Sequence, residues 1–292
     1  MNIVVCVKQI ADINIPVELD PETNSILSEG LAYVVNPYDM LAVEEAVRIK
    51  KKNDGQVTLI SMGESSAEMA LRKCLALGAD RAILLYDPAF AGSDGYATAM
   101  VLAKAIALLQ YDLVLCGVRA IDTNAAQVGS AIAAMLDIAL VTGVTKIEVL
   151  ADQKKLVVQR KLEAGNREVV ETPLPALLTV EAGLNKPTYP SLPSMIVAQR
   201  GKIERCSIKE LGLSLNEVGS RGARTDTVRL SPSKPRPKKI FTPDSSLSAA
   251  ERMRLIISGG IAEKKGDLLE GEPAELVSRL IQFLRQEKLL PQ

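Results

Sequence analysis

Continuously apolar runs alternate with amphipathic stretches over the first 140 residues of the chain. Between the runs, hydrophobic positions recur at helical spacing over residues 38–52, 65–77, 94–109 and 124–136. The runs themselves are typical of strands covered on both faces of a parallel sheet, and they lie at residues 3–7, 57–61, 82–86 and 113–116. This alternation predicts an α/β fold with a doubly wound, mostly parallel, Rossmann-like sheet.

The pattern changes after residue 140, where the apolar runs become shorter and richer in β-branched residues. Turn-forming residues separate the runs, as in hairpins. We therefore predict a β-hairpin extension of the sheet, with strands at residues 144–149, 156–161, 168–171 and 176–180.

Prolines are frequent in the last third of the chain. Those at 232, 235, 237 and 243 alternate with lysine and arginine, as in an extended linker. Late helices are expected at 248–258 and 273–288, the second with an apolar stripe. We therefore expect an α/β domain over residues 1–200 and an extended C-terminal arm over 201–292. The stripe needs a surface to cover it, either the core or a partner chain.

Composition excludes several classes of function. The chain has 35 basic and 35 acidic residues, so it lacks the positive excess that nucleic-acid-binding proteins carry. It has no histidine, which excludes histidine acid–base catalysis, histidine-activated nucleophiles and histidine metal ligands. None of its four cysteines is paired at the spacing of a zinc or thioredoxin motif. We therefore expect no nucleic-acid partner and neither catalytic nor metal-ligating residues.

The sequence shows no sign of secretion or membrane insertion. The first residues are strand-like and too short for a signal peptide, and no uncharged apolar run approaches 18 residues. We therefore expect a cytoplasmic chain without a transmembrane segment.

The loop at residues 117–130 is the strongest candidate for a binding site. Ligands of doubly wound sheets lie beyond the carboxyl ends of the strands, and this loop follows the strand that ends at Cys116. Gly117 permits a tight turn, one of the residues 122–124 can cap the next helix, and Asn124 with Gln127 has the spacing of a capping box. Free N–H groups at that helix start would bind an anion. The alternative is simply a well-capped helix.

Three further loops at the same edge have two interpretations each. The Asn36-Pro37 pair is a strong helix-start signal, Gly63 permits close approach of a ligand, and Asp94 is a candidate helix cap. Small polar loop residues suit a nucleotide better than covalent catalysis, because no base–nucleophile pair accompanies them. Arg160 and Lys161 are most simply part of a solvated, charged hairpin.

Taken together, the motifs resemble those of the electron transfer flavoprotein β subunit. They occur in order over about the first 200 residues, and they are Val5-Cys6-Val7-Lys8-Gln9, Asn36-Pro37-Tyr38-Asp39, Ala76-Leu77-Gly78-Ala79-Asp80-Arg81, Gly117 with Ala120-Ile121-Asp122, Leu174-Pro175-Ala176 and Leu184-Asn185-Lys186-Pro187. The resemblance implies an adenine-nucleotide-binding fold and an obligate heterodimer with an α subunit that carries FAD. It implies an electron-transfer subunit rather than a self-sufficient enzyme, with the C-terminal arm packed on the α subunit.

A second set of motifs resembles the electron-bifurcating, Fix-type branch of that family. Phe90-Ala91-Gly92-Ser93-Asp94 with Thr98 is one such motif, although Gly95 replaces a usual threonine, and Lys238-Lys239-Ile240-Phe241 is another. This branch implies FAD as the cofactor, with NADH, ferredoxin and an acyl-CoA-type or other flavin dehydrogenase as partners. The alternative within the family is a non-bifurcating subunit that binds AMP. An alternative outside it is a stand-alone sensor of the universal-stress type, which would not need the long arm.

The resemblance also assigns residues to two sites. The partner-recognition segment, residues 189–193, has Tyr189, Leu192 and Pro193 as its contacts. The expected cofactor-binding residues are Cys6, Val7, Lys8, Asn36, Tyr38, Asp39, Met62, Gly63, Phe90, Ser93, Asp94, Thr98, Gly117, Arg119, Ala120, Ile121, Asp122, Thr123, Asn124, Gln127, Val128, Gly129 and Ser130.

Overall fold

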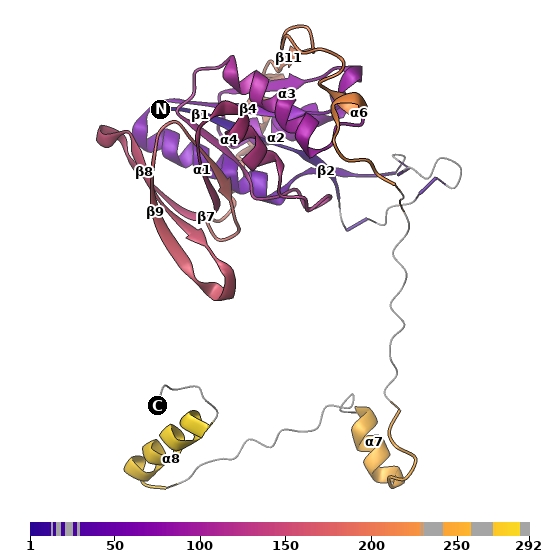
Figure 1. Ribbon diagram of the computed structural model, residues 1–292, viewed down its shortest axis with the longest axis vertical. Coiled ribbons are helices and arrows are strands. Elements are labelled where there is room, and N and C mark those ends of the chain that lie inside the picture. Colours follow the sequence, from indigo (N-terminus) through magenta and orange to yellow (C-terminus); the bar gives the residue numbers. More distant parts are fainter. Residues whose placement is uncertain are drawn as a thin grey trace. The chain divides into compact units, whose positions relative to one another are not determined.

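The computed structural model describes residues 1–12, 14–15, 19–20, 26–27, 30–228, 230, 242–257 and 271–286 (Figure 1). The chain forms two compact units, Met1–Pro232 and Ser233–Gln292. The first unit therefore extends about thirty residues beyond the boundary expected at 200. The reason is that residues 204–218 add a strand to the sheet and bury Leu211, Leu213 and Val218.

The first unit is built on one nine-stranded sheet in the order β11-β5-β4-β1-β6-β10-β7-β8-β9 (Figure 1). Every pair from β11 to β7 is parallel, while β8 and β9 are antiparallel additions. The strands are β1 (Asn2–Cys6), β4 (Gln56–Met62), β5 (Arg81–Leu85), β6 (Leu113–Gly117), β7 (Ala139–Leu150), β8 (Lys155–Lys161), β9 (Arg167–Pro173), β10 (Ala176–Val180) and β11 (Glu204–Cys206). A separate antiparallel pair joins β2 (Gln9–Ala11) and β3 (Tyr33–Val35). The predicted α/β fold and its hairpin extension are confirmed.

The sheet is doubly wound around β1. From β1 the chain adds β4 and then β5 on one side, and it returns to place β6 on the other side. The strand order therefore reverses between β1 and β6, which is where ligands of such sheets bind.

Four helices cover the two faces of the parallel sheet. They are α1 (Pro37–Asn53), α2 (Glu68–Ala76), α3 (Gly95–Ala107) and α4 (Val128–Leu136). Ile3 and Val5 of β1 pack in one cluster with residues of α1 and α2, and Val4 packs in the other with residues of α3 and α4. Because successive side chains of a strand point to opposite faces, both faces of the predicted strands are apolar.

One of the strands predicted for the hairpin extension is a strand but does not belong to a hairpin. Residues 176–180 form β10, an internal parallel strand between β6 and β7, and all five of its residues are buried. The physical reason is the unbroken run Ala176-Leu177-Leu178-Thr179-Val180, which suits a strand covered on both faces better than a half-exposed hairpin.

The remaining helices lie towards the C-terminus. The first unit holds α5 (Leu192–Arg200) and α6 (Gly219–Gly222), and the second holds α7 (Ala249–Ile257) and α8 (Pro273–Gln286). Leu280 and Phe283 of the predicted stripe on α8 are exposed. The linker prolines 232, 235 and 237 and the motif at 238–241 lie outside the described residues. No helix in the described ranges is long and apolar enough to cross a bilayer.

Candidate nucleotide-binding site

Asp39 joins the two strands at which the sheet order reverses. Its carboxylate accepts the N–H of Lys8, just past β1, at 2.8 Å and the N–H of Gly117, at the end of β6, at 2.9 Å. The side chain lies in the first turn of α1 and is buried. The predicted site residue Asp39 therefore holds the carboxyl ends of β1 and β6 at a fixed spacing.

Asn36 performs the same task for the loop that follows β6. Its Nδ2 donates to the carbonyl of Arg119 at 2.9 Å, and its Oδ1 accepts the N–H of Ile121 at 3.3 Å. Asn36 occupies the N-cap position of α1, but its side chain makes no cap hydrogen bond. The predicted helix start is correct, and the polar side chain is used to hold the neighbouring loop.

Burial changes the acid–base behaviour of the groups around Asp39. It raises the pKa of the Asp39 carboxyl to about 7, although the N–H donors of Lys8 and Gly117 and the Asn36 side chain lower it. Burial also raises the pKa of the Cys6 thiol to about 12, so this thiol stays neutral. Cys6 and Cys116 are buried and unpaired, as expected for small core residues.

The loop after β6 has an unusual backbone. Asn124 and Ala126 both have φ near +54°, a left-handed conformation that side chains other than glycine rarely adopt. The loop is tied down by an ion pair between Lys8 Nζ and Asp122 Oδ2 at 2.7 Å. Strained backbone of this kind persists where the surrounding structure enforces it, and it concentrates at ligand sites.

The left-handed residues also move the start of the next helix. The predicted helix begins at Asn124, but α4 begins at Val128, because a left-handed residue cannot continue a right-handed helix. The predicted capping box is wrong as well: Gln127 is the N-cap residue, and its side chain makes no cap hydrogen bond. The Asp122 carboxylate accepts from Thr123 and Lys8 instead of capping α4.

The start of α4 is therefore open. The first N–H inside the helix to find a helical acceptor is that of Ala131, which donates to the Gln127 carbonyl at 3.0 Å. Among the described residues, no acceptor faces the N–H groups of Val128, Gly129 and Ser130. Such groups, together with the positive end of the helix dipole, attract a phosphate.

Gly129 lets this open helix start lie directly against the sheet. A Cβ at position 129 would be 2.7 Å from Cys116 Sγ and 2.8 Å from Thr179 Cγ2, which is closer than real contacts allow. Gly117 has a similar role, since a Cβ there would meet the Asp39 carboxylate and Tyr38 Cβ. Both glycines of the predicted phosphate loop are thus required by close packing.

The start of α3, in contrast, is closed by the chain itself. Asp94 Oδ1 accepts the N–H of Ala97 at 2.9 Å, and Oδ2 accepts from Arg224 and Thr225. Burial would raise the pKa of Asp94, but these hydrogen bonds outweigh it and hold the pKa below its usual value. The simpler interpretation of Asp94, as the cap of the helix that follows, is therefore confirmed.

Other residues of the predicted flavin loop are also engaged internally. Ser93 Oγ donates to the Phe90 carbonyl at 2.8 Å and accepts the N–H of Gly219 at 3.1 Å. Phe90 is buried in the core. Thr98 differs, because its hydroxyl has no hydrogen-bond partner among the described residues.

The predicted loops meet at one edge of the sheet. A Cβ at Gly95 would lie 3.0 Å from Gln127 Oε1, so the start of α3 borders the loop that precedes α4. Met62 ends β4, the neighbour of β1, and Gly63 follows it. Val7 is buried just past β1. Arg119 Nη2 donates to the Tyr38 hydroxyl at 3.0 Å. The carbonyl of Ala120 accepts the N–H of Asn124, which closes a turn that includes Thr123.

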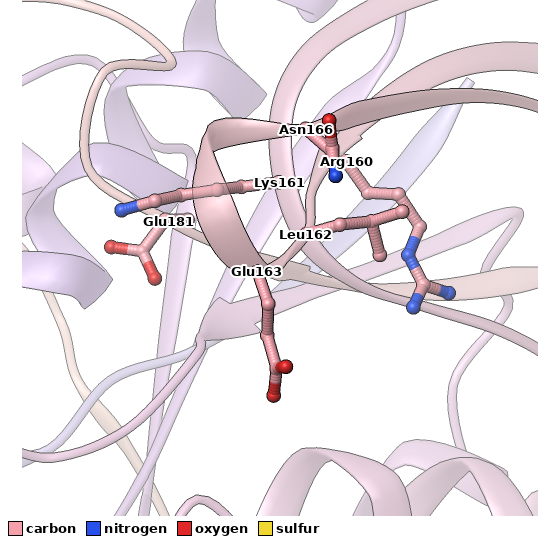
Figure 2. Close-up of a pocket in the computed structure, with 6 residues that line it drawn as sticks. All are labelled: Arg160, Lys161, Leu162, Glu163, Asn166 and Glu181. Atoms are coloured by element: carbon pink, nitrogen blue, oxygen red, sulfur yellow. The ribbon is translucent and has the colours of Figure 1, made fainter. Parts of the chain in front are cut away.

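An open surface pocket of about 720 Å³ lies at the end of the β8–β9 hairpin (Figure 2). Its lining includes Arg160, Lys161, Glu163 and Glu181, and Figure 2 shows the Lys161 ammonium directed towards the Glu181 carboxylate. Glu181 follows Val180, whose carbonyl accepts the N–H of Val118 in the loop after β6. Sequence reasoning missed Glu181, because no local pattern brings it to this edge.

The predicted recognition segment begins a helix. Tyr189 is 98% exposed and Leu192 is 67% exposed, while Pro193 lies in the first turn of α5. The sequence pattern predicted no helix here, whereas the structure has α5 from residue 192 onward. The signal was available: Ser191 caps the helix by accepting the N–H of Ser194, and Pro193 follows it.

Comparisons with known proteins identify the family. The profile described as "Electron transfer flavoprotein domain" matches residues 23–211. "Electron transfer flavoprotein subunit beta" of Thermoanaerobacterium thermosaccharolyticum is 48% identical over 83% of this chain and 92% of its own length. "Caffeyl-CoA reductase-Etf complex subunit CarD" of Acetobacterium woodii is 42% identical over 78% and 87%, and "Protein FixA" of Azotobacter vinelandii is 39% identical over 82% and 86%. The chain therefore belongs to the electron transfer flavoprotein family, as a β subunit of its Fix-type branch.

Proposed function

We propose that this chain binds FAD at the open start of α4 and transfers electrons as one subunit of an obligate heterodimer. The observation that carries the proposal is the unfilled set of N–H groups at residues 128–130, at the point where the strand order reverses. In this proposal the N–H groups hold a phosphate of the nucleotide. Asn36 and Asp39 hold the surrounding loops in position.

The flavin supplies the redox chemistry when it is bound, and the protein supplies placement and electrostatics. Thr98, in the first turn of α3, offers a free hydroxyl where the flavin ring is expected, whereas the Ser93 hydroxyl already donates to Phe90. The proposal therefore assigns the ring contact to Thr98 and a supporting role to Ser93. Tyr38 and Arg119, whose side chains contact each other, are also among the residues proposed to line the nucleotide.

We prefer FAD over AMP because the chain is similar to proteins of the branch for which the resemblance implies FAD. Two of them are named for the Fix proteins and for a caffeyl-CoA reductase–Etf complex. On this basis we propose flavin-based electron bifurcation, with electrons passing between NADH or a dehydrogenase, this subunit and the α-subunit FAD, and with ferredoxin as an acceptor. A non-bifurcating subunit that binds AMP is the second candidate, and the closed start of α3 is the observation that favours it.

The proposed partners are an α subunit and an acyl-CoA-type or other flavin dehydrogenase. The exposed side chains of Tyr189 and Leu192, with Pro193 beside them, are proposed to contact the dehydrogenase. The exposed stripe on α8 is proposed to pack on the α subunit. All four cysteines are unpaired, which is consistent with the cytoplasm as the proposed location.

The test is to purify the chain with its α subunit, release the bound small molecules with acid and separate them. The proposal predicts two FAD per heterodimer and little AMP. One FAD with one AMP would move the protein to the AMP-binding candidate. Absence of any adenine nucleotide beyond the α-subunit FAD would contradict binding at α4 itself.

A further inference from the structure

Helix α5 exposes its apolar side chains and buries almost none. Leu192 is 67% exposed and Val197 is 71% exposed, and Met195 and Ile196 are exposed as well. Ala198 is the single buried residue of this nine-residue helix. Helices of this length are not stable in water on their own, and most gain their stability from packing an apolar face. Another interaction must therefore hold α5 against the protein.

Arg72 of α2 provides that interaction. Its Nη1 lies 2.9 Å from the carbonyl oxygen of Ala198, 2.8 Å from that of Gln199 and 3.0 Å from that of Gly201. The first two carbonyls lie in the last turn of α5, and the third belongs to Gly201, the C-cap residue that follows it. Carbonyls at a helix end lack partners within the helix. The guanidinium also places a positive charge at the negative end of the helix dipole.

Glu68 fixes the Arg72 side chain from the same helix. Its Oε2 lies 3.8 Å from Arg72 Nη2, and its Oε1 accepts from Arg205 Nε at 3.0 Å and from Arg205 Nη2 at 2.7 Å. Arg205 lies in β11, the strand that follows α5 in the chain. The exit of α5 is therefore held through one connected group of two arginines and a glutamate.

The entry to α5 is held at a different helix. Asn185 Nδ2 donates to Glu45 Oε2 at 3.1 Å, and the Thr188 hydroxyl bonds the Glu44 carboxylate at 2.8 Å. Both glutamates lie in α1. The segment with the exposed apolar residues is thus held at its two ends by polar side chains, while its middle stays free.

We infer that Arg72 is a positioning residue for partner docking: it orients α5 so that Leu192, Met195 and Ile196 present one apolar stripe to the partner dehydrogenase. These three residues are spaced three and four apart, so they lie on one side of the helix. Arg72 acts through the carbonyls of α5 and touches no partner. The inference rests on the proposed docking role of residues 189–193 and adds the residue that makes the docking helix rigid.

The test compares Arg72→Ala with Lys73→Ala in the full heterodimer. Lys73 is the neighbouring exposed cation on α2, so its removal matches the lost charge without affecting α5. The probe is a purified acyl-CoA dehydrogenase that exchanges electrons with the unmodified heterodimer. Reduction of a small dye by the heterodimer reports on the flavins without docking.

For Arg72→Ala we expect the KM for the dehydrogenase to rise about tenfold, as for loss of an interface anchor, with kcat and dye reduction nearly unchanged. Hydrogen exchange over residues 192–201 should become faster. Arg72→Lys keeps the charge but not the forked donors, so it should give an intermediate KM. Lys73→Ala should match the unmodified protein in every measurement.

Leu192→Ala separates this inference from the docking proposal. If Leu192→Ala leaves the KM unchanged, the docking proposal fails. If Leu192→Ala raises the KM but both Arg72 variants keep a normal KM, the docking proposal stands and the role of Arg72 is refuted. If Arg72→Ala does not yield folded heterodimer, Arg72→Lys alone decides, with an unchanged KM and exchange rate as the contradicting result.

Discussion

Helices α3 and α4 begin at the same edge of the sheet, next to each other, yet their first turns are satisfied in opposite ways. Asp94 caps α3 and also binds Arg224 and Thr225, so the chain itself fills that helix start. The start of α4 follows two left-handed residues and has no side-chain cap. The N–H groups of a filled helix start are satisfied within the chain, whereas those of an open one are available to an anion. The comparison therefore supports the proposal that the phosphate binds at α4.

The largest expected effect comes from filling the space that keeps α4 close to the sheet. Gly129→Val would drive a side chain into Cys116 and Thr179, and overpacking of this kind costs about 1–3 kcal/mol or more. We expect the displaced helix start to lose its nucleotide, measured as nucleotide released per purified heterodimer. The control is Ala134→Val, a similar change at an exposed position of α4. Full nucleotide retention in Gly129→Val would contradict the site.

The next effect is a pH dependence that originates at Asp39. Its pKa is about 7 in the folded protein against an ordinary 3.8, so between these values the folded state holds a proton that the unfolded state has lost. The contribution of Asp39 to the free energy of unfolding should therefore fall as pH rises from about 4 to about 7 and stay constant above that range.

The measurement is denaturant unfolding of the heterodimer across this pH range, compared with Asp39→Asn. The variant should lose the slope between pH 4 and 7, and it should also be less stable overall, because an amide cannot accept from both N–H groups. Leaving a buried N–H without a partner costs about 1–3 kcal/mol. An unchanged slope in Asp39→Asn would show that other groups cause the dependence.

A smaller effect is expected at the closed helix start. Asp94→Ala should lower the free energy of unfolding by about 1–2 kcal/mol, the usual cost of losing an N-cap. The proposal assigns the phosphate to α4, so the amount of adenine nucleotide retained should stay the same. Loss of nucleotide together with an unchanged free energy of unfolding would reverse the roles of the two helices.

The smallest effect concerns the ion pair between Lys8 and Asp122, which tethers the open loop. Both side chains are partly exposed, and such pairs contribute about 0–1 kcal/mol. Asp122→Asn should weaken nucleotide retention about two- to threefold at low salt, and salt screening should remove the difference at high ionic strength. If Asp122→Asn lowers nucleotide retention equally at high salt, Asp122 acts by contacting the ligand and not through its ion pair with Lys8.

The same comparison explains what the sequence could predict. Asp94 was predicted as a cap because the deciding contact, to Ala97, spans three residues. The same local rule predicted a cap among residues 122–124, and this prediction was wrong, because the Asp122 carboxylate binds Lys8, which is 114 positions away. The parallel sheet and its four helices were predictable, since their apolar patterns are local. The internal place of β10 was not, because it depends on pairing with β6 and β7.

The candidate site was predictable as a set of loops but not as an arrangement. Asn36 was identified from a helix-start motif and Asp39 from the family resemblance. Their bonds to Arg119 and Gly117 join segments about eighty residues apart. The hydrogen bonds from Arg72 to α5 join residues more than 120 positions apart, so no local sequence pattern could predict them. Local patterns therefore predict the elements, while the contacts that assemble a site at a sheet edge depend on topology.

The most direct test of the open helix start is hydrogen exchange on the heterodimer, with its nucleotides bound and after their removal. The account predicts that amides at residues 128–130 exchange slowly when nucleotide is bound and much faster without it. Amides of Ala97 and Thr98 donate to Asp94 in the chain itself, so their exchange should be slow in both states. Equal exchange at 128–130 in the two states, with protection appearing at the start of α3 instead, would contradict the account.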